Sequence, residues 1–147
     1  MLATPTVFEC VVSFEPTSLK RHRHRMMGSG IIGTYDPSQK DKREFVQRIP
    51  NLPELDARFS CPLKCDLTFF CKRPKAHFNA ALTGLKDSAP KFNTNHKDLD
   101  NMVKFVLDAL NGVLYVDDRQ IVDIHCAKVY ENTFCEEGHI QLRFEAL

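Results

Sequence analysis

The chain has 147 residues, of which 43% are hydrophobic and 10% are aromatic, enough to close the core of one globular domain. No apolar stretch approaches the length that spans a bilayer, and the apolar run from Val7 contains Glu9 and has no basic residues before it, unlike a secretory signal. We therefore expect a single domain over residues 1–147 in a soluble intracellular protein.

Charge is unevenly distributed along the chain, although its net value is only +1. Residues 1–97 hold 16 Lys and Arg against 9 Asp and Glu, which leaves +7, whereas residues 98–147 hold 4 against 10, which leaves −6. A basic half and an acidic half suit a polyanion bound by one part and attacked by metal ions held in the other. An ordinary solvated surface is the alternative interpretation.

The six cysteines favour neither a zinc site nor disulfides, because no two of them form a CxxC pair. Cys65 and Cys71 are in phase with Leu67 and Phe69, which is typical of small core residues on a strand. We expect free thiols in a reducing compartment.

Apolar alternation predicts strands over residues 7–14, 63–71, 113–117, 121–130 and 139–145. A short helix is expected within residues 37–50, and the strongest helical pattern covers residues 99–111. The basic, glycine-containing segment 19–33 is expected to be a surface loop, and the long polar segment 72–97 a functional loop. This order predicts an α+β fold, with a mixed β-sheet packed against one major helix.

Both loops contain candidate phosphate-binding side chains, with plain solvent exposure as the alternative. These DNA-binding candidates are Lys20, Arg21, Arg23, Arg25, Lys72, Arg73 and Lys75. Phe78 and Phe92 in the second loop are candidates for wedges that stack on opened bases, although loop aromatics also serve as anchors.

The stretch from Asp98 to Asp118 concentrates aspartates around an amphipathic helix. Asp98 suits the N-cap, and Asn111-Gly112 suits the stop. The helix rises roughly 20 Å, and the six residues from Val113 to Asp118 return about the same distance if extended, which brings Asp117 and Asp118 back beside Asp98 and Asp100. Adjacent strand residues point to opposite faces, so we expect one of Asp117 and Asp118 to join. We therefore expect a cluster of three or four carboxylates at one end of a helix-strand hairpin.

Such a cluster requires a compensating cation or bound protons. Hard oxygen ligands favour Mg²⁺, with Mn²⁺ as a substitute, and such an ion activates water for attack on a phosphodiester. Lys104, one turn from Asp100, is placed to stabilise negative charge on a phosphate. Taken singly, Asp98 also suits a cap, Asp100, Lys104 and Asp108 suit surface ion pairs, and the remaining acids suit a solvated turn.

Three blocks of this sequence together resemble the RusA family of Holliday junction resolvases. The blocks are Asp98-x-Asp100-Asn101-x-x-Lys104, Asp108-Ala109-Leu110-Asn111-Gly112 and Asp117-Asp118-x-Gln120-Ile121. Their order and spacing are far more specific than a lone DxD. Lys97 stands where the family commonly has proline, a difference that removes no ligand.

The resemblance implies a homodimeric, Mg²⁺-dependent endonuclease that binds four-way junctions and related branched DNA and nicks two opposing strands symmetrically, in DNA recombination and repair. By position, Asp98, Asp100 and Asp118 look like metal ligands, Asp117 like a supporting acid at the metal, and Lys104 like the catalytic lysine. Asn101, Asp108 and Gln120 match as supporting residues, with Asn101 expected to orient a carboxylate and Asp108 to hold Lys104.

Two other functions remain open from the sequence. One is a protein that binds branched DNA without cutting it, and the other is a different Mg²⁺-dependent phosphodiesterase acting on nucleotides or RNA. Cleavage of a junction by the unmodified protein excludes the first, and competition between branched DNA and those molecules separates the second.

Overall fold

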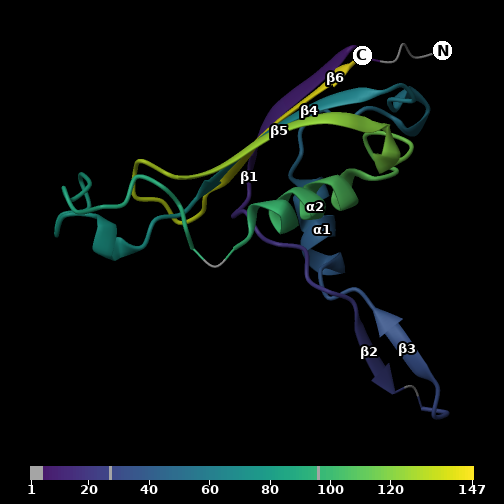
Figure 1. Cartoon of the computed structure of the whole chain (residues 1–147), viewed down its shortest axis with the longest axis horizontal. Coiled ribbons are helices and arrows are strands. Elements are labelled where there is room, and N and C mark those ends of the chain that lie inside the picture. Colours follow the sequence, from purple (N-terminus) through teal and green to yellow (C-terminus); the bar gives the residue numbers. More distant parts are fainter. Residues whose placement is uncertain (1–4, 27, 96) are drawn as a thin grey trace.

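A four-stranded sheet with two helices on one face forms the body of the protein (Figure 1). The computed structural model describes residues 5–26, 28–95 and 97–147. Its strands and helices are β1 (Val7–Ser13), β2 (Arg23–Met26), β3 (Ile32–Tyr35), α1 (Gln39–Gln47), β4 (Leu63–Cys71), α2 (Leu99–Leu110), β5 (Ile121–Tyr130) and β6 (His139–Ala146). The predicted α+β class with a mixed sheet is confirmed, and α2 is the predicted major helix.

The direction of α2 follows from the way the sheet is connected. The strand order is β1-β6-β4-β5, with β4 and β5 parallel and the other neighbours antiparallel. Two parallel neighbours require a crossover connection, here α2. The helix of such a unit runs back against its strands. The start of α2 therefore lies at the carboxyl ends of β4 and β5, and its end lies where β5 begins.

The core lies between the sheet and the helices. Alternate residues of β4, from Leu63 to Cys71, are buried on the helical side, as the pattern predicted, with Cys65 and Cys71 among them. Phe14 after β1, Phe45 of α1 and Phe105 of α2 pack together, with ring centroids 5.3 to 6.0 Å apart. Each such burial contributes about 1.5–3 kcal/mol, so this trio joins both helices to the sheet.

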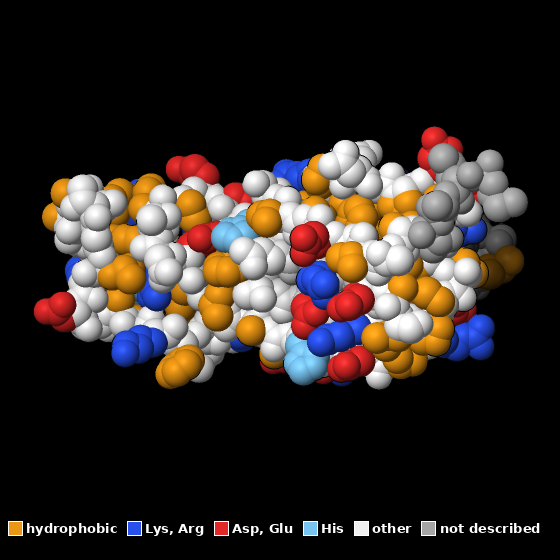
Figure 2. Space-filling model, turned by 90° about the horizontal axis from the view of Figure 1, so that it is seen from above, with side chains coloured by type: hydrophobic (Ala, Val, Ile, Leu, Met, Phe, Trp, Pro, Cys, Tyr) orange, Lys and Arg blue, Asp and Glu red, His pale blue; other side chains and the backbone are white. Residues whose placement is uncertain are grey.

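The opposite face of the sheet carries acidic and basic side chains interspersed (Figure 2). Arg143 of β6 lies between Glu9 of β1, at 3.5 Å, and Glu145, at 2.6 Å. This face has the polar composition of a solvated sheet surface. Among the described residues, no helix is both long enough and apolar enough to cross a membrane.

The strand predicted over 113–117 is wrong. After α2 the chain makes a compact turn, in which the Gly112 N–H donates to the Tyr115 carbonyl at 2.9 Å, and Gly112 adopts a positive φ of 78°. Leu114 and Tyr115 are fully buried, and Tyr115 forms isolated bridges to Phe59 and Asn111 instead of joining a strand. The apolar residues of this segment fill the core beneath the sheet, which explains their strand-like pattern.

The basic segment predicted to be a loop forms an antiparallel ribbon. β2 pairs with β3 from Arg23↔Tyr35 to Met26↔Ile32, and the ribbon projects from the body beside the helices (Figure 1). We call residues 20–36 the arm, described except at position 27. The tip contains Gly30 with φ 81°, a conformation that favours glycine and reverses the chain.

A second projection leaves the end of the sheet where β4 and β5 end and β6 begins (Figure 1). We call residues 72–95 together with 131–138 the lobe. At its base the Glu15 carboxylate accepts hydrogen bonds from the N–H groups of Lys72, at 3.1 Å, and Gly138, at 2.7 Å. A Cβ at Gly138 would come within 2.0 Å of the Phe70 carbonyl oxygen, so only glycine allows this close approach.

Candidate active site

Asp98 and Asp100 lie at the start of α2, with their carboxylates exposed. Asp98 is the N-cap residue, with φ −74° and ψ 133°, yet among the described residues its side chain makes no capping hydrogen bond. The Asp100 side chain is 73% exposed. The capping role that was an alternative for Asp98 is therefore unused, and both carboxylates are accessible to a ligand.

Three separate segments hold the start of α2 in place. The Lys97 ammonium donates to the Pro16 carbonyl at 2.7 Å. Lys128, from β5, donates to the Lys97 carbonyl at 2.6 Å. The Leu19 N–H donates to the Asn101 carbonyl at 3.0 Å. The acid pair therefore has a defined position relative to the sheet and to the root of the arm.

Lys104 lies on the exposed face of α2, one turn after Asp100. Its ammonium is 4.0 Å from Asp100 Oδ2, and the Lys104 side chain is 63% exposed. An exposed pair at this spacing contributes only about 0.3–0.5 kcal/mol to stability. The lysine is consequently a mobile cation beside the acid pair, able to turn toward a bound phosphate.

Asp108 pairs with a different lysine from the one expected. It contacts Lys42 of α1, and Lys42 also contacts Asp36 at the root of the arm. Burial opposes the charge of Lys42, but hydrogen bonds to Asp108 and Asp36 hold the pKa of its ammonium above the usual range. The expectation that Asp108 holds Lys104 is therefore wrong, because Asp108 links α2 to the arm instead.

Asp117 and Gln120 build the turn before β5. The Asp117 N–H donates to Gln120 Oε1 at 2.8 Å, and the Gln120 amide donates to the carbonyls of Phe59 and Cys61, each at 3.0 Å. The Arg119 side chain donates to both oxygens of Asp117, which holds the pKa of this carboxyl below its usual range. Asp118, within this turn, is exposed.

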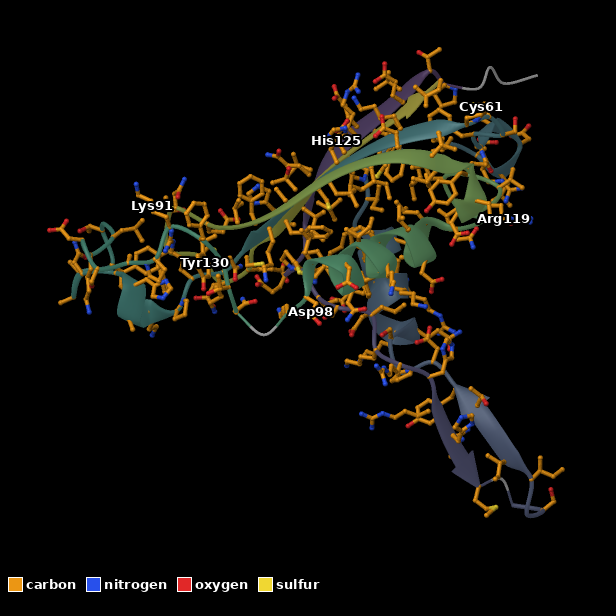
Figure 3. All side chains as sticks on the ribbon, viewed as in Figure 1. Cys61, Lys91, Asp98, Arg119, His125 and Tyr130 are labelled. Carbon is orange, nitrogen blue, oxygen red and sulfur yellow. The ribbon has the colours of Figure 1, made fainter. Side chains whose placement is uncertain are left out.

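The two acid pairs lie at opposite ends of α2. Figure 3 shows Asp98 at the first turn of the helix and Arg119, beside Asp117 and Asp118, at the other end. Twelve residues of helix separate them by about 18 Å. In the described part of the chain, no three Asp, Glu, His or Cys side chains are close enough to share a metal ion. The predicted meeting of three or four carboxylates within one chain is therefore wrong, because α2 runs against β5.

The basic candidates divide by exposure. Lys20, Arg21, Arg23 and Arg25 are exposed on the arm, and Lys72 and Lys75 are exposed on the lobe. Arg73 is only 5% exposed. Its guanidinium donates to the carbonyls of Glu131 and Pro90, both at 2.7 Å, and lies 4.6 Å from the centre of the Tyr130 ring. These contacts make Arg73 a structural residue of the lobe and remove it from the DNA-binding candidates.

The two candidate wedges also differ. Phe78 is buried against Phe134, with ring centroids 5.8 Å apart, so it anchors the lobe. Phe92 is 81% exposed and stays a candidate.

Two lysines that position the site were missed. Lys128 follows Ile124 and Cys126 on one face of β5, and a charge in that apolar phase was a usable signal. Lys42 left no signal, since Asp108 is 66 residues away and Asp36, six residues before Lys42, lies outside the helix that carries it.

A protein-family comparison covers this site. The model described as Endodeoxyribonuclease RusA matches residues 13–140, which include both acid pairs, Lys104 and the arm. The chain belongs to the RusA family. It is also similar to a second protein, named Uncharacterized protein YqaN, from Bacillus subtilis (strain 168), with 30% identity over 120 residues that cover 79% of this chain and 82% of that protein.

RusA membership places the chain in a family of endodeoxyribonucleases, which agrees with the chemistry of the acid pair. In the described part of the chain, the Asp98 carboxylate makes no capping hydrogen bond, and Asp100 has only the 4.0 Å contact with Lys104. Their exposed oxygens are a donor set that fits Mg²⁺ or Mn²⁺. Mg²⁺ characteristically takes one or two carboxylates and completes its shell with water and substrate phosphate oxygens. The pair is therefore a suitable half of a metal site.

Proposed function

We propose that this chain is a divalent-metal-dependent endonuclease that resolves four-way junctions and related branched DNA by paired, symmetric nicks. The observation that carries the proposal is the exposed, uncapped pair Asp98 and Asp100, with Lys104 one turn away. The RusA match supports the nuclease chemistry. The arm and the lobe, which lie on either side of the start of α2 in Figure 1, support the choice of a branched polyanion.

The chain's own residues have separable tasks in this proposal. A bound Mg²⁺ or Mn²⁺ supplies an activated water and neutralises phosphate charge. Asp98 and Asp100 hold that ion, while Lys104 stabilises negative charge that develops on the scissile phosphate. Asp117 is already occupied by Arg119, so it acts by keeping the adjacent Asp118 in position.

A homodimer accounts for the distance between the acid pairs. Among the described strands, β5 has a neighbour on one edge only, and residues 122–127 of this strand are exposed. Pairing of two such edges in antiparallel fashion places two α2 helices side by side in opposite directions. Asp118 of one copy then approaches Asp98 and Asp100 of the other. Two such composite sites related by a two-fold axis suit two equivalent strands of a junction.

The deciding experiment compares a mobile four-way junction with linear duplex of the same sequence, in Mg²⁺ and in EDTA. The unmodified protein should nick opposing strands of the junction, and both EDTA and Asp100→Asn should abolish the nicks. Glu9→Gln removes an exposed acid on the face of the sheet opposite the helices and should cut normally. Tight binding of the junction without nicks under Mg²⁺ and Mn²⁺ would contradict the proposal and favour a protein that only holds branched DNA.

A further inference from the structure

The arm extends into solvent and its tip is not covered by any described part of the chain. β2 and β3 pair with each other and leave the body as a ribbon (Figure 1). A two-stranded ribbon has no core of its own and is marginally stable in water. Because the fold maintains this projection without internal packing, its contacts are with a partner.

The charge of the arm favours a polyanionic partner. The arm contains Lys20, Arg21, Arg23 and Arg25 and a single acid, Asp36 at its root, which gives +3 with histidine neutral. Arg23 and Arg25 point to the same face of the ribbon as Tyr35, and the Arg25 guanidinium lies 5.6 Å from the centre of that ring. Such a face suits phosphates of a nucleic acid backbone.

The tip of the arm has different chemistry from its stem. The side chains of Met26, Ile31 and Ile32 are 71%, 65% and 64% exposed. Met26 pairs with Ile32 across the ribbon, in the alternation opposite to Arg23 and Arg25. Exposed apolar side chains gain nothing from phosphates, whereas they insert readily between base pairs and unstack them. The tip is therefore suited to bases and the stem to backbone.

The length of the arm matches this division. The six residue-to-residue steps from Lys20 to Met26 reach about 20 Å when extended. The DNA major groove is about 8.5 Å deep and about 12 Å wide and admits a two-stranded ribbon. A ribbon of this length brings its tip to the base pairs while its root stays outside the groove. The reach of the arm is thus sufficient for base contact.

The root of the arm is tied to the helix that carries the acid pair. The Leu19 N–H bonds to the Asn101 carbonyl, and the Lys20 N–H donates to Ser38 Oγ at 2.9 Å. On the other side, Lys42 joins Asp36 to Asp108 of α2. A contact made by the tip therefore has a defined position relative to Asp98 and Asp100.

We propose that the arm enters a groove of one duplex beside the branch point, and that Met26, Ile31 and Ile32 pack against the adjoining base pair and open it. The inference rests on the proposed function, since it takes branched DNA as the ligand. Arg23 and Arg25 hold the flanking phosphates. The arm thereby places an opened branch point at a fixed distance from the acid pair.

The test uses a four-way junction with 2-aminopurine, a base whose fluorescence rises on unstacking, next to the branch point. Binding of the unmodified protein in EDTA should raise the fluorescence. The tip variant Ile31→Ser/Ile32→Ser should lose that rise and cut the junction at least tenfold more slowly in Mg²⁺. The control Val11→Ser/Leu55→Ser changes two exposed apolar side chains on the body and should behave as the unmodified protein.

The stem is tested separately with Arg23→Ala/Arg25→Ala. This variant should bind junction and linear duplex more weakly. The number of neutralised phosphate charges, obtained from the salt dependence of its binding, should fall by about two. An unchanged salt dependence would contradict the backbone contacts of the stem.

The remaining outcomes distinguish this inference from the function on which it rests. A tip variant that raises the fluorescence and cuts like the control overturns the role of the tip, even when junction cleavage itself is established. Fluorescence that rises through the tip, in a protein that never cuts, supports the arm and overturns the nuclease proposal. Tip-dependent binding to vesicles of anionic lipid, without an effect on DNA, assigns the arm to a membrane surface and overturns the inference.

Discussion

The backbone N–H of Leu19 donates a hydrogen bond of 3.0 Å to the backbone carbonyl of Asn101. Leu19 immediately precedes the arm, whereas Asn101 lies in the first turn of α2, beside Asp100. Because two backbone atoms make this bond, no substitution of either side chain removes it directly. The position of the arm relative to the acid pair is therefore built into the main chain.

Mixing two inactive variants tests whether the site is shared between copies. Asp100→Asn and Asp118→Asn should each be inactive alone. A composite site predicts that a mixed dimer regains one intact site, because Asp118 of the first variant meets Asp100 of the second. The measurement is single-strand nicking of a junction after the variants are mixed and allowed to exchange.

The control for this mixture is the doubly substituted Asp100→Asn/Asp118→Asn chain with either single variant. Such pairs restore no intact site and should stay inactive. Absence of nicking in the first mixture, despite exchange of subunits shown with differently tagged chains, would place both acids of a site in one chain.

Substitution of Lys104 separates catalysis from stability. Lys104→Ala should slow single-turnover cleavage by about 10²–10³-fold, the usual effect of removing one group that stabilises transition-state charge. Its melting temperature should change little, because the pair with Asp100 is exposed and spans 4.0 Å. Lys40→Ala, an exposed lysine on α1, is the matched control. A large loss of stability without a loss of rate would make Lys104 a structural residue.

Lys42 should stabilise the packing of the root of the arm against α2. Lys42→Ala leaves Asp36 and Asp108 without their shared cation, and we expect a loss of about 1–3 kcal/mol in the free energy of unfolding. Chemical denaturation measures this change. Lys40→Ala again serves as control, and equal stabilities for both variants would show that the bridge contributes nothing.

The same bridge predicts a pH dependence of stability. Burial opposes ionisation of Asp36, but hydrogen bonds from Lys42 and the Ser38 N–H hold the pKa of this carboxyl below its ordinary value of 3.8. A lowered pKa stabilises the folded protein above pH 3.8, and that stability is lost as pH falls through the folded value. Between pH 6 and 3, the free energy of unfolding should therefore decrease less steeply with falling pH for Asp36→Asn than for the unmodified protein. Identical slopes would exclude the contribution of Asp36.

Alanine substitutions of Arg73 and Lys75 should affect different properties, the first the stability of the lobe and the second the binding of DNA. Arg73→Ala removes a buried donor from two carbonyls and should cost about 1–3 kcal/mol locally, seen as faster amide hydrogen exchange in residues 72–95. Lys75→Ala should leave exchange unchanged but lower the salt dependence of junction binding by about one charge. An Arg73→Ala protein with native exchange and weaker salt dependence would return Arg73 to the DNA-binding surface.

Local pattern in the sequence was sufficient to locate four strands and the major helix of the body, and the exposed charges at the start of that helix. Alternation located β1, β4, β5 and β6, and helical periodicity located α2, since these patterns depend on which face of each element is buried. The spacing of Asp98, Asp100 and Lys104 predicted one exposed group of charges at the start of α2, which the structure contains.

Longer-range relationships depended on the three-dimensional arrangement of the elements. The crossover from β4 to β5 makes α2 run against both strands, and this direction separates Asp118 from Asp98. Likewise, Asp108 meets Lys42, 66 residues away, because α1 packs on α2. Spacing along the chain determines which side chains share a face of one element, whereas the connectivity of the sheet determines which ends of different elements meet.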